Sequence, residues 1–318
     1  MGGLTTVTGQ SHSDVLVDVT ERARSYFEAR QAVNTRRAYA ADLRHFEDWC
    51  ARQGLEALPA APQTVALYLT DHAGRLSVAT LQRRLSAIAG AHKLKGLESP
   101  TRHAAVATVW SGIKRTHGTA HARVAPILGA DLRAMLAALR DSLTGVRDRA
   151  LLLLGFAGAF RRSELVALDW SDIEETAEGL VVTLKRSKTD QEGEGAKVGI
   201  PRGRTAETCP DAALRAWKAA SAGEGPVFRN LTRHGRIGGR LSDKGVALVV
   251  KRAAEAAGLD PARFSGHSLR AGLATAAAAA GASERAIGNQ TRHKSLKVLR
   301  GYIREGSLFR ENAAATVL

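Results

Sequence analysis

The sequence predicts a mainly α-helical protein with two domains and a small β-hairpin in the second domain. Its 318 residues suit two domains of ordinary size. Apolar residues recur at helical spacing along most of the chain, which is typical of helices that bury one face. The segment 118–127 (GTAHARVAPI) interrupts that spacing with glycine, histidine and proline, so we expect the inter-domain linker there.

The first domain is expected to be an all-helical unit over residues 21–117. Residues 1–20 precede it, carry no aromatic side chain, and predict a flexible arm. Within the domain, Phe46 and Trp49 share one face of a helix, and a similar apolar stripe runs along residues 81–88. These stripes predict a small helical core.

The second domain is expected over residues 128–318 and combines helices with one hairpin. A very apolar helix is expected at 147–160. Residues 179–185 alternate as a strand, and the chain returns as a second strand at 197–201 after a glycine-containing turn. The last segment, 307–318 (SLFRENAAATVL), predicts a short C-terminal helix.

The charge of the chain points to a polyanionic partner. Lys and Arg total 46 against 31 Asp and Glu, a formal charge of +15, and nucleic acid is the usual partner of such a protein. An anionic membrane surface is the alternative, but it requires one concentrated basic amphipathic helix, and here the arginines are spread along the chain. We therefore expect a DNA-binding protein without a membrane partner.

The cysteines and the N-terminus predict a cytoplasmic, nucleoid-associated protein. Cys50 and Cys209 are far apart, which excludes a disulfide scaffold and a cysteine-based zinc site and fits a reducing compartment. The first residues are polar and contain no apolar signal core.

Polar residues on the helices of the first domain are candidates for DNA contacts. The helix that Ser77 opens has a polar face that could lie in a major groove, with Gln and Arg at base edges and Lys at phosphates. We place His92 on that face too. A solvated basic face is the alternative. The predicted DNA-contacting residues are Arg36, Arg37, Thr80, Gln82, Arg83, Arg84 and Lys93.

Two polar pairs, a histidine and a tyrosine carry the candidate chemistry of the second domain. Arg161 and Glu164 are three residues apart after the apolar helix, and so are His267 and Arg270 further along the chain. Tyr302 is the candidate nucleophile, and the histidine at position 293 lies nine residues before it. This arrangement suits a phosphate that several cationic donors hold and a tyrosine attacks.

The requirements of that chemistry assign further roles. A guanidinium grips two phosphate oxygens and keeps its charge, so no metal ion is strictly needed. A phenol has an ordinary pKa of about 10, so cations or a base must help it to ionise. The leaving sugar oxygen needs a proton donor, for which Lys188 on the hairpin turn is the candidate and Lys185 and Lys197 are rivals.

Each of these residues also has an ordinary explanation when it is taken alone. Arg161 with Glu164 is a common i,i+3 helical ion pair, and His267 with Arg270 could be a surface pair. A single tyrosine is more often a packing residue. It is the joint order and spacing of all of them that favours a phosphate-transfer site.

In this order the residues resemble the motifs of the tyrosine recombinase (phage integrase) family, and most closely those of the Cre-type enzymes. Arg161–Leu165 is similar to the Arg-x-x-Glu-Leu motif, Ser187–Thr189 to the Ser-Lys-Thr of the hairpin, and His267–Gly272 to His-x-x-Arg-x-Gly. His293 and Tyr302 are similar to the last motif. Many relatives place Leu-Gly before that histidine, whereas this chain has Thr291–Arg292.

The resemblance implies a site-specific DNA recombinase without metal, ATP or other cofactor. Arg161, His267, Arg270 and His293 would hold the scissile phosphate, with Glu164 orienting its surroundings. Lys188 would protonate the leaving 5′ oxygen, and Tyr302 would form a 3′-phosphotyrosine bond.

The resemblance also implies an assembly. The two domains would form a C-shaped clamp on duplex DNA with an inverted-repeat site. Four protomers on two DNA sites would exchange strands through a Holliday junction, with 307–318 as an exchange helix. The alternatives are a type IB topoisomerase-like enzyme, which uses the same nucleophile and donors, and a DNA-binding regulator without catalytic activity.

Overall fold

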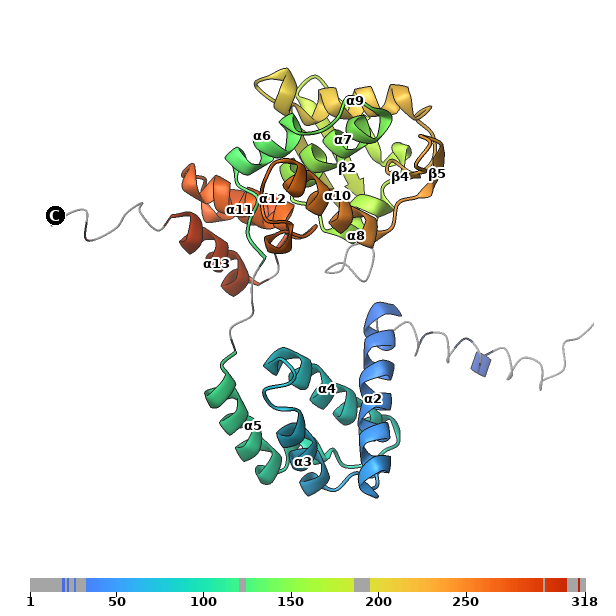
Figure 1. Cartoon of the computed structure of the whole chain (residues 1–318), viewed down its shortest axis with the longest axis vertical. Coiled ribbons are helices and arrows are strands. Elements are labelled where there is room, and N and C mark those ends of the chain that lie inside the picture. Colours follow the sequence, from blue (N-terminus) through green and yellow to red (C-terminus); the bar gives the residue numbers. More distant parts are fainter. Residues whose placement is uncertain are drawn as a thin grey trace, which may run out of the picture. The chain divides into compact units, whose positions relative to one another are not determined.

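The computed structural model of the chain describes residues 33–119, 124–185, 195–293 and 295–307, and the single positions 19, 20, 22, 26 and 314. The chain divides into two compact units, residues 1–122 and 123–318, and each is described by itself (Figure 1). None of the helices within the described residues has both the length and the apolar character that crossing a membrane requires.

The first unit is helical throughout its described part, as predicted. Phe46, Trp49, Tyr68, Leu81 and Ile88 lie at its centre and are almost completely buried. The elements are α2 (Val33–Gln53), α3 (Pro62–His72), α4 (Val78–Leu94), a 3-10 turn η1 (Pro100–Arg102) and α5 (Ala104–His117).

Helix α4 begins where the sequence indicates. The side-chain oxygen of Ser77 accepts a hydrogen bond from the backbone N–H of Thr80, which satisfies one of the donors that a helix start leaves without a partner. The chain leaves this helix through Gly96 at φ +70°, a backbone conformation that glycine adopts at low cost.

The second unit contains eight helices among its described residues. Its core is a single large cluster that includes Leu151–Leu154 of α7 and Val246, Val249 and Val250 of α10. The helices are α6 (Gly129–Ala137), α7 (Leu143–Ala157), α8 (Arg162–Ala167), α9 (Pro210–Ala220), α10 (Asp243–Ala256), α11 (Ser268–Ala279), α12 (Glu284–Thr291) and α13 (Leu296–Gly306), and the 3-10 turns are η2 (Trp170–Asp172), η3 (Ala206–Thr208) and η4 (Pro261–Arg263).

The apolar helix that we predicted at 147–160 is α7, but it begins four residues earlier. Ser142 caps it by accepting a hydrogen bond from the N–H of Gly145. Arg147 and Asp148 lie inside the helix and are buried as a pair, with Arg147 Nε 2.8 Å from Asp148 Oδ1. Because this polar pair interrupts the apolar pattern, the pattern did not identify the residues before it as part of the helix.

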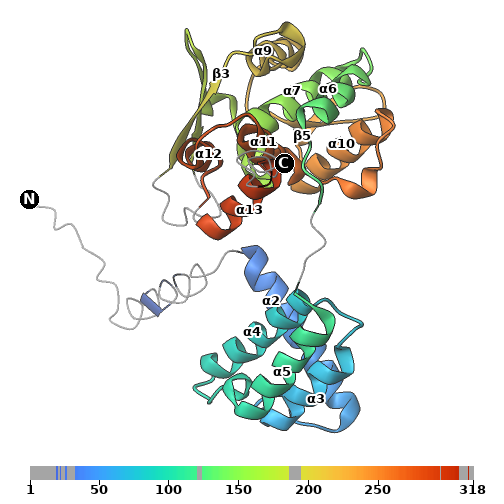
Figure 2. The same ribbon diagram turned by 90° about the vertical axis from the view of Figure 1, so that its left-hand side faces the viewer.

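The predicted hairpin is confirmed and belongs to a three-stranded antiparallel sheet. Strand β2 (Gly179–Leu184) pairs with β3 (Ala196–Pro201), with Val182 opposite Val198, and β1 (Ile173–Glu175) adds to the other edge of β2. Strands β4 (Arg229–Leu231) and β5 (Ile237–Arg240) form a second, two-stranded sheet. The short strands β1, β4 and β5 were not predicted. Figure 2 shows the larger sheet at one side of the unit and α10 at the opposite side.

The end of the expected linker is part of the second unit. Ile127 is fully buried in the core, and its N–H donates to the carbonyl of Ser268 at the start of α11. A Cβ on Gly272 would lie 2.0 Å from the carbonyl oxygen of Ile127, so only glycine fits there. The chain entering the unit thus fixes the helix that carries Arg270.

Candidate active site

The turn between α7 and α8 positions Arg161 and Glu164. The Glu164 carboxylate folds back onto the helix start: Oε2 accepts from the backbone N–H of Arg161 at 2.9 Å, and Oε1 accepts from the Arg161 guanidinium. The Glu164 side chain is only 1% exposed. The ordinary ion pair is therefore present, and it fixes the direction of Arg161.

Arg270 enters the same region from the first turn of α11. Arg270 is 1% exposed, and its Nη1 donates to the carbonyl of Ala159 at 2.8 Å. The other terminal nitrogen, Nη2, has no hydrogen-bond partner among the described residues. Burial, followed by the like charge of Arg161, lowers the pKa of Arg270 to about 9. A donor that is buried without a partner is suited to hold an anion.

Tyr302 lies between the two predicted histidines. His267 Nε2 is 3.1 Å from the Tyr302 hydroxyl, and the ring of His293 lies 5.8 Å from the tyrosine ring, centre to centre. Helix α13 is held against α11 closely, because a Cβ on Gly306 would meet the carbonyl oxygen of Thr275 at 2.3 Å. This packing fixes the position of Tyr302 along the axis of α11, and so its position relative to Arg270.

His293 is anchored by the residue two positions before it. Its Nδ1 is 2.7 Å from the hydroxyl of Thr291, which is fully buried and donates to the carbonyl of Ile287. Burial, then the charges of Arg270 and Arg161, lower the pKa of His293 to about 4. The imidazole is therefore neutral at neutral pH.

Arg292 also belongs to the site, and we did not predict it. It ends α12 in the left-handed conformation at φ +55°, and its guanidinium Nη2 donates to Glu164 Oε2 at 3.0 Å. Burial is the main cause that lowers its pKa. The only signal in the sequence was that Thr291–Arg292 replaces the Leu-Gly of many relatives, and it gave no indication of where the side chain points.

Two arginines thus share one carboxylate, and a third lies near enough to feel its charge. The side chains of Arg161, Arg292 and Glu164 are 17%, 13% and 1% exposed, and Arg270 lies beside them. Burial would raise the pKa of Glu164, but the backbone N–H of Arg161 and the charges of Arg292 and Arg161 lower it overall. Poorly hydrated cations in excess are costly, and a bound anion such as a phosphate removes that cost.

The three candidate lysines differ in whether the structure describes them and in what they contact. Lys188 lies outside the described residues. Lys185 follows β2 and forms an ion pair with Asp172, with 2.6 Å between Nζ and Oδ1; this hydrogen bond raises its pKa. Lys197 on β3 is exposed and lies opposite Thr183 in the sheet.

The DNA-contact residues predicted in the first unit divide into two groups. Arg37, Gln82 and Lys93 are exposed, and Arg36 and Thr80 are partly exposed. The Arg83 side chain is 48% exposed, and its guanidinium grips both oxygens of the buried Asp42.

Arg84 and His92 are corrections to the predicted polar face. Arg84 is 8% exposed and donates to the Tyr68 hydroxyl at 2.8 Å, so the prediction that it contacts DNA is wrong. His92 is 1% exposed, and its Nε2 accepts from the backbone N–H of Ala60 at 2.9 Å. Both side chains turn inward because they satisfy polar groups that the helical core would otherwise leave unpaired.

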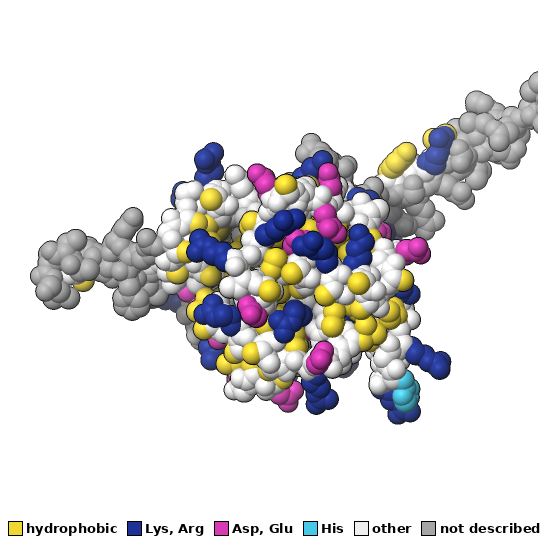
Figure 3. All heavy atoms as spheres, turned by 90° about the horizontal axis from the view of Figure 1, so that it is seen from above, with side chains coloured by type: hydrophobic (Ala, Val, Ile, Leu, Met, Phe, Trp, Pro, Cys, Tyr) yellow, Lys and Arg dark blue, Asp and Glu magenta, His cyan; other side chains and the backbone are white. Residues whose placement is uncertain are grey.

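One face of the protein shows its basic side chains scattered rather than grouped. On the face in Figure 3, Lys and Arg are interspersed with Asp, Glu and hydrophobic side chains and form no continuous basic patch.

Of the C-terminal helix predicted over residues 307–318, the structure describes Ser307 at its start. Ser307 ends α13, and its N–H donates to the carbonyl of Ile303. The rest of the expected exchange helix, 308–318, lies outside the described residues apart from position 314.

The chain was compared with protein-family models and with known proteins. The model of the phage integrase family matches residues 127–307, more than half of the chain, and the N-terminal SAM-like domain of phage integrases matches 23–95. The chain is 42% identical to an integrase/recombinase xerD homolog of Selenomonas ruminantium, over 92% of this chain and 87% of that protein. It is 30% identical to the tyrosine recombinase XerC of Xanthomonas campestris pv. campestris, over 81% and 75%.

Solved structures show the same fold. The XerH site-specific recombinase bound to a palindromic difH substrate matches with a TM-score of 0.62 and 18% identity, over 80% of this chain and 72% of that one. A lambda integrase tetramer bound to a Holliday junction matches with a TM-score of 0.62 and 18% identity, over 94% and 79%.

Proposed function

Because the chain belongs to the phage integrase family of tyrosine recombinases, we propose that it is a site-specific DNA recombinase whose nucleophile is Tyr302. The observation that carries this assignment is the position of the Tyr302 hydroxyl, 3.1 Å from His267 Nε2 and on the helix that packs against α11, which carries Arg270. In such a site a hydroxyl lies close to an excess of cationic donors, as attack on a phosphodiester requires.

The proposed reaction is a transfer of the phosphoryl group and needs no external energy. The Tyr302 oxygen attacks the phosphorus, and the bond from phosphorus to the 5′ oxygen breaks. His267, whose Nε2 is 3.1 Å from the Tyr302 hydroxyl, would take the phenol proton, and Lys188 would give a proton to the leaving 5′ oxygen. The 3′-phosphotyrosine bond keeps the energy of the broken DNA bond, so attack by another 5′ hydroxyl reseals the strand without ATP.

Arg161, Arg270 and His293 would hold the phosphate, and Glu164 would orient Arg161. Two guanidinium groups neutralise the charge that spreads over the non-bridging oxygens. Neutral His293 has a single ring N–H. Because the Thr291 hydroxyl already donates to Ile287, that N–H is the Nδ1 that contacts Thr291, so we expect His293 to contribute less than the arginines. The proposed reaction therefore requires no cofactor.

The assembly that we propose is a tetramer on two DNA sites, acting on the nucleoid in the cytoplasm. Each protomer would clamp duplex DNA with its two units, and strand exchange would pass through a Holliday junction. The fold shared with the lambda integrase tetramer on a Holliday junction supports this proposal. A two-fold arrangement of protomers favours an inverted-repeat target.

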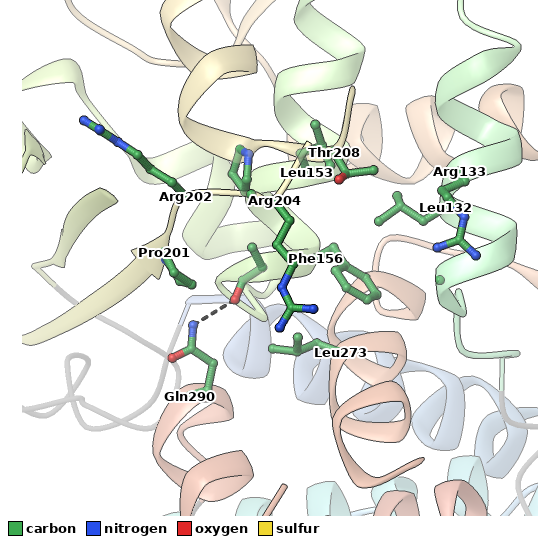
Figure 4. Close-up of a pocket in the computed structure, with 14 residues that line it drawn as sticks. Leu132, Arg133, Leu153, Phe156, Pro201, Arg202, Arg204, Thr208, Leu273 and Gln290 are labelled. Atoms are coloured by element: carbon green, nitrogen blue, oxygen red, sulfur yellow. Dashed lines mark hydrogen bonds between the residues drawn. The ribbon is translucent and has the colours of Figure 1, made fainter. Parts of the chain in front are cut away.

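We also propose that residues 307–318 dock on a neighbouring protomer. A cavity of about 560 Å³ in the second unit offers an acceptor (Figure 4). Leu132, Leu153, Phe156 and Leu273 give it an apolar wall, and Arg204 points toward Leu273. Apolar residues of the tail, Leu308 and Phe309, suit such a wall. Deletion after Glu305 should then preserve binding to one site and weaken assembly on two, as native gels would show; normal tetramers would exclude the exchange.

Selection of bound DNA from a random duplex library tests the proposed function. We expect two inverted half-sites around a short spacer, because two related protomers face each other across the exchanged strands. Unrelated sequences without such symmetry would contradict a site-specific recombinase and favour a topoisomerase-like enzyme. A symmetric site on which the protein never forms a covalent adduct would instead favour a regulator.

A further inference from the structure

One arginine in the second unit has no role in the reaction as described above, although it is one of the most connected side chains of the site. Arg292 Nη1 donates to the carbonyls of Gln290 and Gly158 at 2.7 and 3.1 Å, and Nη2 donates to Glu164 and to the carbonyl of Ala159. Its contacts therefore tie the end of α12 to the turn before α8.

The backbone at both ends of this connection is unusual. Among the described residues, three that are not glycine have a positive φ: Ala159 at +46°, Ala222 at +64° and Arg292 at +55°. Two of the three meet here through the bond from Arg292 Nη2 to the carbonyl of Ala159. Strained backbone of this kind persists where the surrounding contacts hold it, and it is frequent at functional sites.

The contacts of Arg292 converge on the groups that would hold the phosphate. The carbonyl of Ala159 accepts from Arg270 as well as from Arg292. Glu164 accepts from the guanidinium of Arg161 through Oε1 and from that of Arg292 through Oε2. The residue after Arg292 is His293, so the left-handed turn at 292 sets the direction in which the imidazole leaves α12.

We propose that Arg292 is a positioning residue that acts through Glu164: it completes the coordination of the carboxylate, so that Arg161 keeps its direction, and it locks the turn that presents His293. The inference rests on the proposed recombinase function for its kinetic consequence. The inference concerns this chain in particular, because it has an arginine at a position whose backbone conformation favours glycine.

Charge supports the same role. With Arg292 present, one carboxylate serves two guanidiniums, and Arg161 shares the negative charge of Glu164 instead of neutralising it alone. More of the positive charge of Arg161 is then available to a phosphate.

The test replaces Arg292 by glycine, which adopts φ +55° without strain and suits the end of a helix. Single-turnover cleavage of a suicide DNA substrate should slow about tenfold at saturating DNA, within the range of coupling between contacting residues. The DNA concentration for half-saturation should stay within twofold. Arg292→Lys should recover part of the rate, since an ammonium can still reach Glu164 but cannot bridge the carbonyls. Arg285→Ala, an exposed change on the same helix, is the matched control and should have no effect.

A double variant decides whether Arg292 acts through Glu164. Arg292→Gly combined with Glu164→Gln should be no slower than the slower single variant, because both changes break the same unit. Multiplying effects, an unchanged rate in Arg292→Gly, or a loss confined to DNA affinity would each overturn the proposal.

A measurement without catalysis separates this proposal from the recombinase assignment. The ¹⁵N signals of the His293 ring should shift in Arg292→Gly and stay in place in Arg285→Ala, because only the first change releases the turn. If the wild-type protein forms no covalent adduct, the recombinase assignment fails and the ring signals still decide the positioning role. Unmoved signals in Arg292→Gly would overturn it.

Discussion

Among the described residues, Arg84 in the first unit and Arg270 in the second unit are both buried, and their surroundings are opposite. Arg84 in the first unit lies 3.7 Å from Asp42 and donates to the Tyr68 hydroxyl, so its charge has a nearby anion. Arg270 in the second unit donates to one carbonyl, and burial and the charge of Arg161 lower its pKa to about 9.

The difference teaches how to tell a structural arginine from a functional one. A buried cation that lies near a carboxylate and donates to a buried hydroxyl completes a folded core. Where poorly exposed cations outnumber the carboxylates, as Arg161, Arg270 and Arg292 outnumber Glu164, the protein carries a cost that only a ligand removes. Burial alone does not distinguish the two cases, whereas the balance of charge does.

The largest effect should come from the arginines of the second unit. Arg270→Met keeps much of the volume but removes the charge, so cleavage should fall by about 10²–10³, the usual worth of one oxyanion donor, and Arg161→Ala should behave alike. Because the lost charge is poorly compensated, the free energy of unfolding should not fall. Single-turnover cleavage and urea unfolding measure both. A variant that unfolds more easily yet cleaves normally would reverse the functional assignment.

The matched change in the first unit should have the opposite pattern. Arg84→Met leaves the buried Asp42 and the Tyr68 hydroxyl with fewer partners, which costs about 1–3 kcal/mol of stability. Cleavage at saturating DNA should be unchanged. Urea unfolding and the cleavage assay on the same preparation provide the comparison. If Arg84→Met weakens DNA binding without a loss of stability, Arg84 has a DNA-facing role after all.

The smallest effect concerns His293 and pH. Its pKa in the folded chain is about 4, below the ordinary histidine value of 6.5, so the unfolded chain binds the proton first as the pH falls. Stability should therefore be unaffected by this group above about pH 6.5 and decrease as the pH is lowered from there toward 4. Urea unfolding at pH 7 and pH 5 should show a smaller loss in His293→Gln than in the wild type. Equal losses would mean that His293 is hydrated and free of the arginines.

Spacing along the chain predicted the helices, the hairpin and the residues that meet around Tyr302. It succeeded because apolar periodicity and local motifs report on neighbours a few residues apart. It missed Arg292, whose partner Glu164 is 128 residues away. It also placed Arg84 and His92 on a polar face, because a helical pattern cannot show that Asp42, Tyr68 and Ala60 would need polar partners inside the core. The three-residue strands β1 and β4 are too short for alternation to identify them.

The central claim is that the cationic cluster of the second unit serves a reaction at the Tyr302 hydroxyl. The direct test incubates the wild-type protein and Tyr302→Phe with a nicked DNA carrying the selected site, without added metal, and separates the products under denaturing conditions. The account predicts a covalent protein–DNA adduct through residue 302 in the wild type, and none in Tyr302→Phe, which should still bind DNA because only one hydroxyl is lost. An adduct that persists in Tyr302→Phe would contradict the account.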